Sequence, residues 1–153
     1  MESLHTILEY AHSYIRWIIT VLIIVSIVKA FLGMKNNSAF AKDRKIFSMT
    51  MASTHLQLVI GIVLFFIGQH GFNYFNVEGF MKDGGMRYWA VEHWFGMLVA
   101  IALITRGFIS AKKMNDDAKK YRRVGVSYLI AFVIIIITII HGVKSGLEPG
   151  FLS

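Results

Sequence analysis

Four long apolar segments, separated by shorter polar or basic stretches, limit what this chain can fold into. The third, residues 87–110, is apolar from residue 94 to 105 and covers roughly 36 Å as a helix at about 1.5 Å per residue. That length crosses a bilayer with some tilt. The others are predicted at residues 4–33, 46–68 and 124–142. Because 56% of the residues are hydrophobic, against roughly 45–50% in soluble domains, the sequence predicts an integral membrane protein.

In lipid each segment must satisfy its own backbone hydrogen bonds, which favours helix even for the isoleucine run at residues 134–137. Short connections between neighbouring segments then predict one all-α domain over residues 1–153. We expect an up-down-up-down four-helix bundle.

Basic residues predict the orientation of this bundle, because cytoplasmic loops carry an excess of Lys and Arg. Four basic residues follow the first segment and six follow the third, which is ten of the sixteen in the chain: Lys35, Lys42, Arg44, Lys45, Lys112, Lys113, Lys119, Lys120, Arg122 and Arg123. Both loops are therefore predicted to be cytoplasmic. Both termini are predicted to lie on the outer, periplasmic side of a bacterial inner membrane. The net charge of +7 is accordingly assigned to membrane flanks and not to nucleic-acid binding.

The chain has no cysteine, which excludes disulfides, thiolate-bound iron–sulfur clusters and thioether-attached haem. We find no nucleophile–base arrangement, phosphate-binding loop or paired carboxylates. The sequence thus favours an electron-transfer or accessory subunit over a stand-alone enzyme.

Placing an ionisable side chain inside a membrane segment costs free energy unless another group pairs with it or binds it. Counted from the predicted cytoplasmic ends, His12, His93 and His141 lie roughly 24–27 Å from the inner face, and His55 roughly 13 Å. Three imidazoles on three helices thus share one level in the outer leaflet. A haem takes one or two axial ligands at matching depth on facing helices. His12 and His93 meet that condition if their helices are diagonal in the bundle.

Neighbouring residues suit the same cofactor. Arg16 lies one helical turn from His12, where a guanidinium would pair with a haem propionate. Met97 lies one turn from His93 and would pack on the macrocycle or serve as a soft ligand. The glycines at 61, 68 and 96 would let helices or a flat ring approach closely.

Two further interpretations stay open. His55 with Gln57 would form a second ligand site or a pair that hydrogen-bonds a quinone. Glu92, beside His93, would form an ion pair with Arg16 or lie at the membrane interface. In that interpretation no cofactor is bound, and the imidazoles hydrogen-bond across helices.

Three stretches carry a resemblance to a known family: HSYIRW at 12–17, HLQLVIG at 55–61 and RYWAVEHWFGML at 87–98. They resemble small bacterial four-helix membrane proteins labelled cytochrome b-like, in order and in spacing. The resemblance implies a b-type haem protein whose positions of interest are His12, Arg16, His55, Gln57, Glu92, His93 and Met97. One departure concerns the end of the last segment, where a Pro-Trp is expected and His141-Gly142-Val143-Lys144 stands.

The leading hypothesis is therefore a haem b protein that moves electrons within the membrane, with a quinone as a candidate partner. The alternative is a cofactor-free accessory or structural subunit of a larger membrane complex or a homo-oligomer. A lesser alternative is a copper or zinc site built on His12, His93 and His55. A proton or ion path along Glu92, His93 and His55 ranks below these.

Overall fold

The computed structural model describes residues 2–144, with side chains from residue 4 onward. Helix is the only regular structure in that part of the chain. Its elements are α1 (Glu2–Lys35), α2 (Phe40–Ile67), the 3-10 helix η1 (Phe72–Asn76), α3 (Gly84–Arg87), the π-helix η2 (Tyr88–Glu92), α4 (His93–Lys112) and α5 (Asp117–Lys144). The predicted side of the C-terminus concerns residues outside this range.

Four helical segments of the described chain are long and apolar enough to cross a membrane: Leu4–Lys35, Phe40–Asn76, Gly84–Lys112 and Asp117–Lys144. This confirms the predicted all-helical organisation in four segments. By the length and composition of its helices the protein is a multi-pass membrane protein.

Two helices begin earlier than their apolar segments predict. α2 begins at Phe40 and not at residue 46, and α5 begins at Asp117 and not at residue 124. Phe40 and Tyr121 are buried, so each extension carries an inward apolar face although Lys and Arg occupy its outward face. A prediction that defines each helix by its uncharged residues ends the helix at the first charged residue, and it therefore misses these amphipathic turns.

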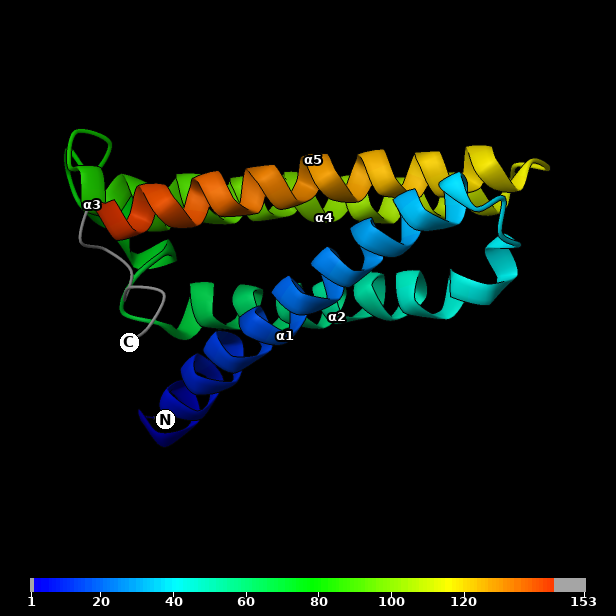
Figure 1. The fold of residues 1–153 in the computed structure, drawn as a ribbon. Helices are drawn as coiled ribbons and strands as arrows, with labels where there is room; N and C mark the ends of the chain where they lie inside the picture. The colour runs from blue at the N-terminus through cyan, green and yellow to red at the C-terminus, as the bar shows by residue number, and fades with distance from the viewer. Residues whose placement is uncertain (1, 145–153) are drawn as a thin grey trace.

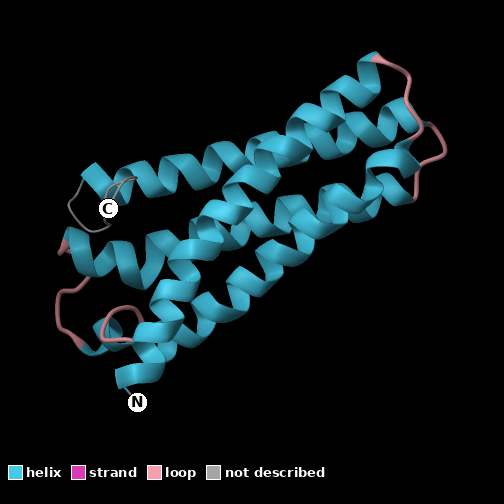
Figure 2. Cartoon of the chain, turned by 60° about the horizontal axis from the view of Figure 1, so that its bottom comes forward, coloured by secondary structure: helices cyan, strands magenta, loops and turns pink. Residues whose placement is uncertain are grey.

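The helices pack in a ring. α1 packs against α2 and α5, and α4 packs against the same two helices, so α1 and α4 lie on a diagonal. Figure 1 shows α4 and α5 side by side along their length. In the same view α1 crosses from the α2 side near its N-terminus toward α5 near its C-terminus. Figure 2 shows the connecting loops gathered at the two ends of the bundle.

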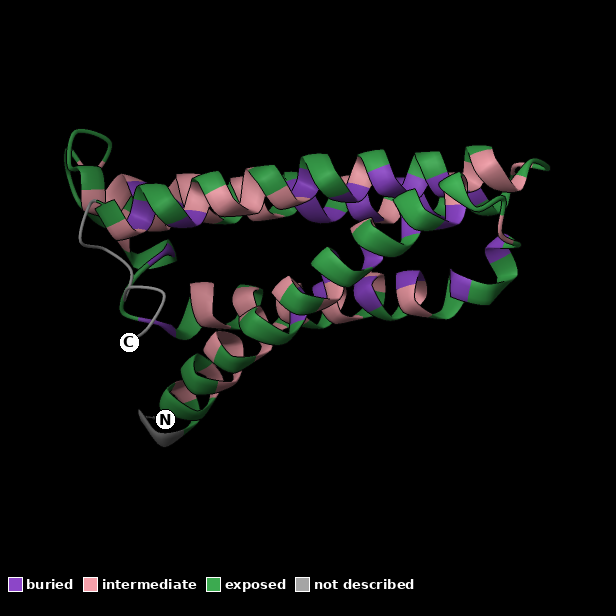
Figure 3. Ribbon diagram, in the orientation of Figure 1, coloured by how far each residue is buried: buried purple, intermediate pink, exposed green. Residues whose placement is uncertain are grey.

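The closed core lies in the half of the bundle next to the α1–α2 and α4–α5 connections (Figure 3), which we call the core half. Aromatic rings dominate it: Phe40 and Phe47 of α2 meet Tyr121 and Tyr128 of α5 at centroid distances of 5.2–6.3 Å. Gly33 of α1 lies directly against the Tyr121 ring, so a side chain there would collide with it. Gly107 of α4 lies equally close to Ser127 of α5, so close helix contact in this half depends on glycines at both positions.

A small polar network joins three helices in the core half. The Lys29 ammonium of α1 lies 2.9 Å from the Asp43 carboxylate of α2, which also accepts a 2.9 Å hydrogen bond from the Tyr121 hydroxyl of α5. The Tyr121 hydroxyl also lies 3.0 Å from the Ala39 carbonyl oxygen. The Asp43 side chain is only 9% exposed, whereas Lys29 is 45% exposed. Breaking the pair should therefore cost more free energy at the buried Asp43 carboxylate than at the exposed Lys29 ammonium.

Replacing Lys29 with methionine should destabilise the protein by about 2 kcal/mol, because the buried Asp43 carboxylate loses its cation. The double variant Lys29→Met with Asp43→Leu should recover most of that loss, since no unpaired charge is then left in the core half. Thermal unfolding of the three proteins in one detergent, followed by circular dichroism, measures the difference. Equal melting temperatures for the single and double variants would contradict this account.

Candidate functional site

Fewer residues are buried between the core half and the far end of the bundle, where Tyr88, Ala90 and Ile139 are buried again. No residue is fully buried at positions 4–18 of α1, 55–67 of α2, 93–99 of α4 or 132–138 of α5, all within the described chain. We call these segments together the histidine half. All seven predicted site residues are half-buried, in this half or at its border: His12, Arg16, His55, Gln57, Glu92, His93 and Met97. Polar side chains thus face the least closed part of the interior.

A π-helical turn, Tyr88–Glu92, opens α4 and determines which side chains meet there. The backbone N–H of His93 donates to the carbonyl oxygen of Tyr88, five residues earlier, and the indole N–H of Trp94 donates to the carbonyl oxygen of Ala90. In a regular α-helix, residues five apart point about 140° away from each other. The wider π turn instead brings such pairs to one face. Sequence reasoning missed this turn, because no glycine or proline marks it.

Glu92 is the first residue that the π turn positions. One carboxylate oxygen lies 2.6 Å from Arg87 Nε, five residues earlier, and the other lies 3.0 Å from His141 Nε2 on α5. The carboxylate therefore links the start of the third span to the end of the fourth. The sequence predicted Arg16 or the membrane interface as the setting of Glu92, and in the structure its carboxylate pairs with Arg87 and His141.

His93 is the second residue that the π turn positions. Its Nδ1 lies 3.2 Å from the Tyr88 hydroxyl, again five residues earlier, and that hydroxyl donates to the Thr138 carbonyl oxygen at 3.3 Å. When the hydroxyl donates its single hydrogen to the carbonyl, it accepts from His93, and the imidazole proton is on Nδ1. The lone pair of the imidazole is then on Nε2. A histidine that ligates a metal commonly has this arrangement, with its other ring nitrogen donating to a fixed acceptor.

His12 lies across the diagonal, on α1. Its ring packs over Gly61 of α2, where a Cβ would stand 3.4 Å from His12 Cε1. Gln57 Nε2 donates to the His12 carbonyl oxygen at 2.8 Å, while the buried Gln57 Oε1 has no hydrogen-bond partner among the described residues. Arg16 is half-buried with its guanidinium 5.9 Å from the centroid of Trp17. Gly61 and Gln57 thus hold this turn of α1 against α2.

His55 and Gln57 do not form a pair. His55 Nε2 lies 2.8 Å from the Thr105 hydroxyl of α4, and that hydroxyl donates to the Ile101 carbonyl oxygen. Gln57, two residues on, faces α1. The structure therefore directs the two side chains to different helices.

The sequence predicted that Gly96 lets helices approach closely, and in the structure it lies where α4 approaches α5. A Cβ at this position would lie 2.6 Å from the Thr138 hydroxyl oxygen. Met97, the next residue, is half-buried beside this contact.

The imidazoles are spread over separate helices and do not converge on one point. Among the described residues no three His, Cys, Asp or Glu side chains form a group that could hold a metal ion. A three-ligand copper or zinc centre finds no support in this geometry, whereas a haem requires only one or two axial ligands.

Comparison of the chain with protein-family models, curated proteins and solved structures finds no match.

Proposed function

We propose that this chain is an integral membrane protein that binds a b-type haem in its histidine half and moves electrons within the membrane. The observation that carries the proposal is the placement of His12 and His93 on diagonal helices, both half-buried where the core is not closed. The resemblance to cytochrome b-like proteins points to the same residues.

The residues present fit such a group. With its Nδ1 donating to the Tyr88 hydroxyl 3.2 Å away, His93 would present the Nε2 lone pair to the iron, and the missing side chain of Gly61 leaves room for the His12 ring. Arg16, four residues from His12, would hold a propionate by a charge-assisted pair. A bound haem supplies one-electron redox chemistry, while the side chains position it and exclude water.

The basic loops support the membrane orientation in this proposal. Both termini face the outer side of a bacterial inner membrane, and the helices run up-down-up-down. The histidine half then lies in the outer leaflet. A membrane quinone is the electron partner that this depth favours, since quinones dissolve in the same apolar layer.

An absorption spectrum tests the proposal directly. The protein is produced in cells supplied with a haem precursor, purified in mild detergent, and measured oxidised and then dithionite-reduced. We expect a Soret band and a sharp α-band on reduction, with stoichiometric haem by the pyridine haemochrome assay. A colourless preparation that also fails to take up added haemin would overturn the proposal.

A cofactor-free accessory subunit is the second candidate, favoured by the exposure of α2. Its span is the least covered of the four within the described chain, which leaves apolar surface for another subunit or for lipid. Gentle detergent extraction followed by size-exclusion chromatography distinguishes the two. A stoichiometric, heavier companion and no haem would favour this candidate over the first.

A further inference from the structure

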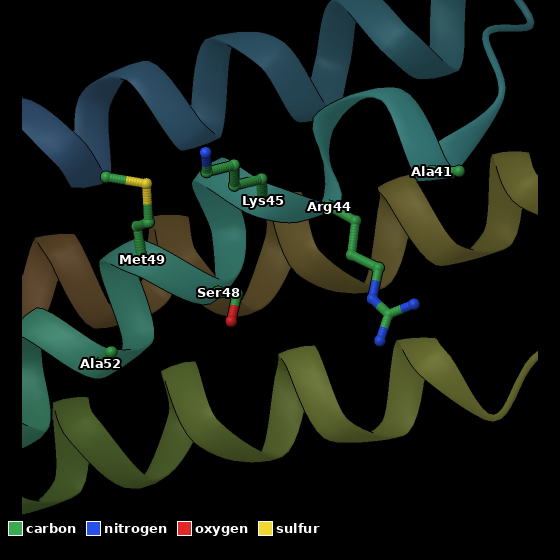
Figure 4. Close-up of a pocket in the computed structure, with 6 residues that line it drawn as sticks. All are labelled: Ala41, Arg44, Lys45, Ser48, Met49 and Ala52. Atoms are coloured by element: carbon green, nitrogen blue, oxygen red, sulfur yellow. The ribbon is translucent and has the colours of Figure 1, made fainter.

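A shallow, open groove, lined by α2 alone, lies on one face of that helix in the core half (Figure 4). It is lined by Ala41, Arg44, Lys45, Ser48, Met49 and Ala52 and has a volume of about 410 Å³. The spacing of three and four residues places all six side chains on one helix face. The buried residues of this part of α2, Phe40, Asp43, Phe47, Thr50 and Thr54, lie on the opposite face. The groove therefore faces away from the bundle interior.

The polarity of the groove changes along its length. Arg44 and Lys45 stand at the end near the α1–α2 connection, Ser48 follows one turn later, and Met49 and Ala52 form the apolar end. From Arg44 to Ala52 the helix rises about 12 Å. That distance takes the groove from the level of lipid headgroups into the upper acyl chains.

The cations of the groove have no acidic neighbour in it. Asp43, the nearest carboxylate in sequence, is turned inward to Lys29 and Tyr121. Neither Arg44 nor Lys45 forms an ion pair with any described residue. In Figure 4 Arg44 and Ser48 extend to one side of α2 and Lys45 and Met49 to the other, so the two cations flank the groove.

We infer that this groove binds an anionic phospholipid, with its phosphate between Arg44 and Lys45 and one acyl chain along Met49 and Ala52. Basic pockets at the cytoplasmic side of membrane helices suit acidic headgroups, and each cation near the surface contributes about 1 kcal/mol to that attraction. The Ser48 hydroxyl is placed to donate to a headgroup oxygen. A free phosphate ion would leave the apolar end unused. This site lies on the surface of the core half that faces away from the bundle interior, and it is independent of the haem proposal.

The test compares two double variants that remove the same charge. Arg44→Gln with Lys45→Gln alters the groove. Arg122→Gln with Arg123→Gln instead removes two exposed cations near the start of α5, at the same end of the bundle as the groove. The proteins are placed in nanodiscs that contain phosphatidylglycerol and phosphatidylethanolamine, and retained lipids are counted by native mass spectrometry. The unaltered protein should retain phosphatidylglycerol in preference to phosphatidylethanolamine.

The groove variant should lose about 30-fold in this preference, the equivalent of about 1 kcal/mol for each of two cations, while the α5 variant should keep most of it. A third variant, Ala52→Trp, should fill the apolar end and reduce retention without changing charge. Equal losses in both charge variants would show a general surface effect and overturn the inference. So would undiminished retention in the groove variant, or displacement of the lipid by inorganic phosphate with no dependence on Ala52.

Discussion

Replacing His93 with alanine should lower haem retention by at least about tenfold and remove the low-spin spectrum of whatever haem remains. The physical reason is loss of the imidazole that would ligate the iron through Nε2 while its Nδ1 contacts the Tyr88 hydroxyl. Even the partners of a ligating histidine are worth about 10–100-fold in metal affinity, so loss of the ligand itself should cost no less. Pyridine haemochrome content and the reduced α-band measure the effect.

Two variants serve as controls for His93. His70→Ala removes an exposed loop imidazole that contacts the rings of Tyr74 and Trp89, and it should leave the spectrum unchanged. Tyr88→Phe removes only the hydroxyl, so it should keep the haem but raise its midpoint potential, because a less basic imidazole stabilises ferric iron less. If His93→Ala and His70→Ala gave the same spectrum, the ligand role of His93 would be wrong.

Replacing Gly33 with valine should strongly destabilise the core half, at about 3 kcal/mol or roughly 6–12 °C in Tm. The new Cβ would overlap Cε1 and Cζ of the Tyr121 ring. That ring cannot move aside easily, because its hydroxyl is bonded to Asp43 and Ala39 and its edge packs on Phe40 at 5.2 Å. Thermal melting in detergent measures the loss.

Gly84→Val is the matched control for Gly33→Val, because nothing lies within 4 Å of the position where its Cβ would stand. It should change Tm by no more than an ordinary surface substitution, within about 0.5 kcal/mol. Combining Gly33→Val with Tyr121→Ala should cost less than the sum of the two single changes, since the second makes room for the first. Strict additivity would show that the valine does not meet this ring.

The sequence predicted the four spans because hydropathy is a property of each segment alone. It placed the starts of α2 and α5 too late, since Phe40 and Tyr121 are buried on turns that also carry Lys and Arg. Which turns are amphipathic depends on the neighbour that each face meets. That information belongs to the assembled bundle and not to the segment.

The same limit applies to the candidate site. Counting along helices predicted that His12, His93 and His141 would lie near one level; His12 and His93 are half-buried, whereas His141 is exposed. Their partners could not be predicted, because they depend on helix rotation and on the π turn. That turn replaces the expected pairing of residues four apart with pairing of residues five apart, as in Tyr88 with His93 and Arg87 with Glu92.

The uneven packing of α1 has a mechanical consequence. From Leu4 to Ile18 the helix buries no residue, and its first buried residue is Ile19. The preceding turns therefore form an arm of about 22 Å, and a tilt of about 10° at Ile19 would displace Leu4 by roughly 4 Å and His12 by roughly 2 Å. Such a tilt would break the 2.8 Å hydrogen bond from Gln57 to the His12 carbonyl oxygen, while the rings around Tyr121 would stay in place.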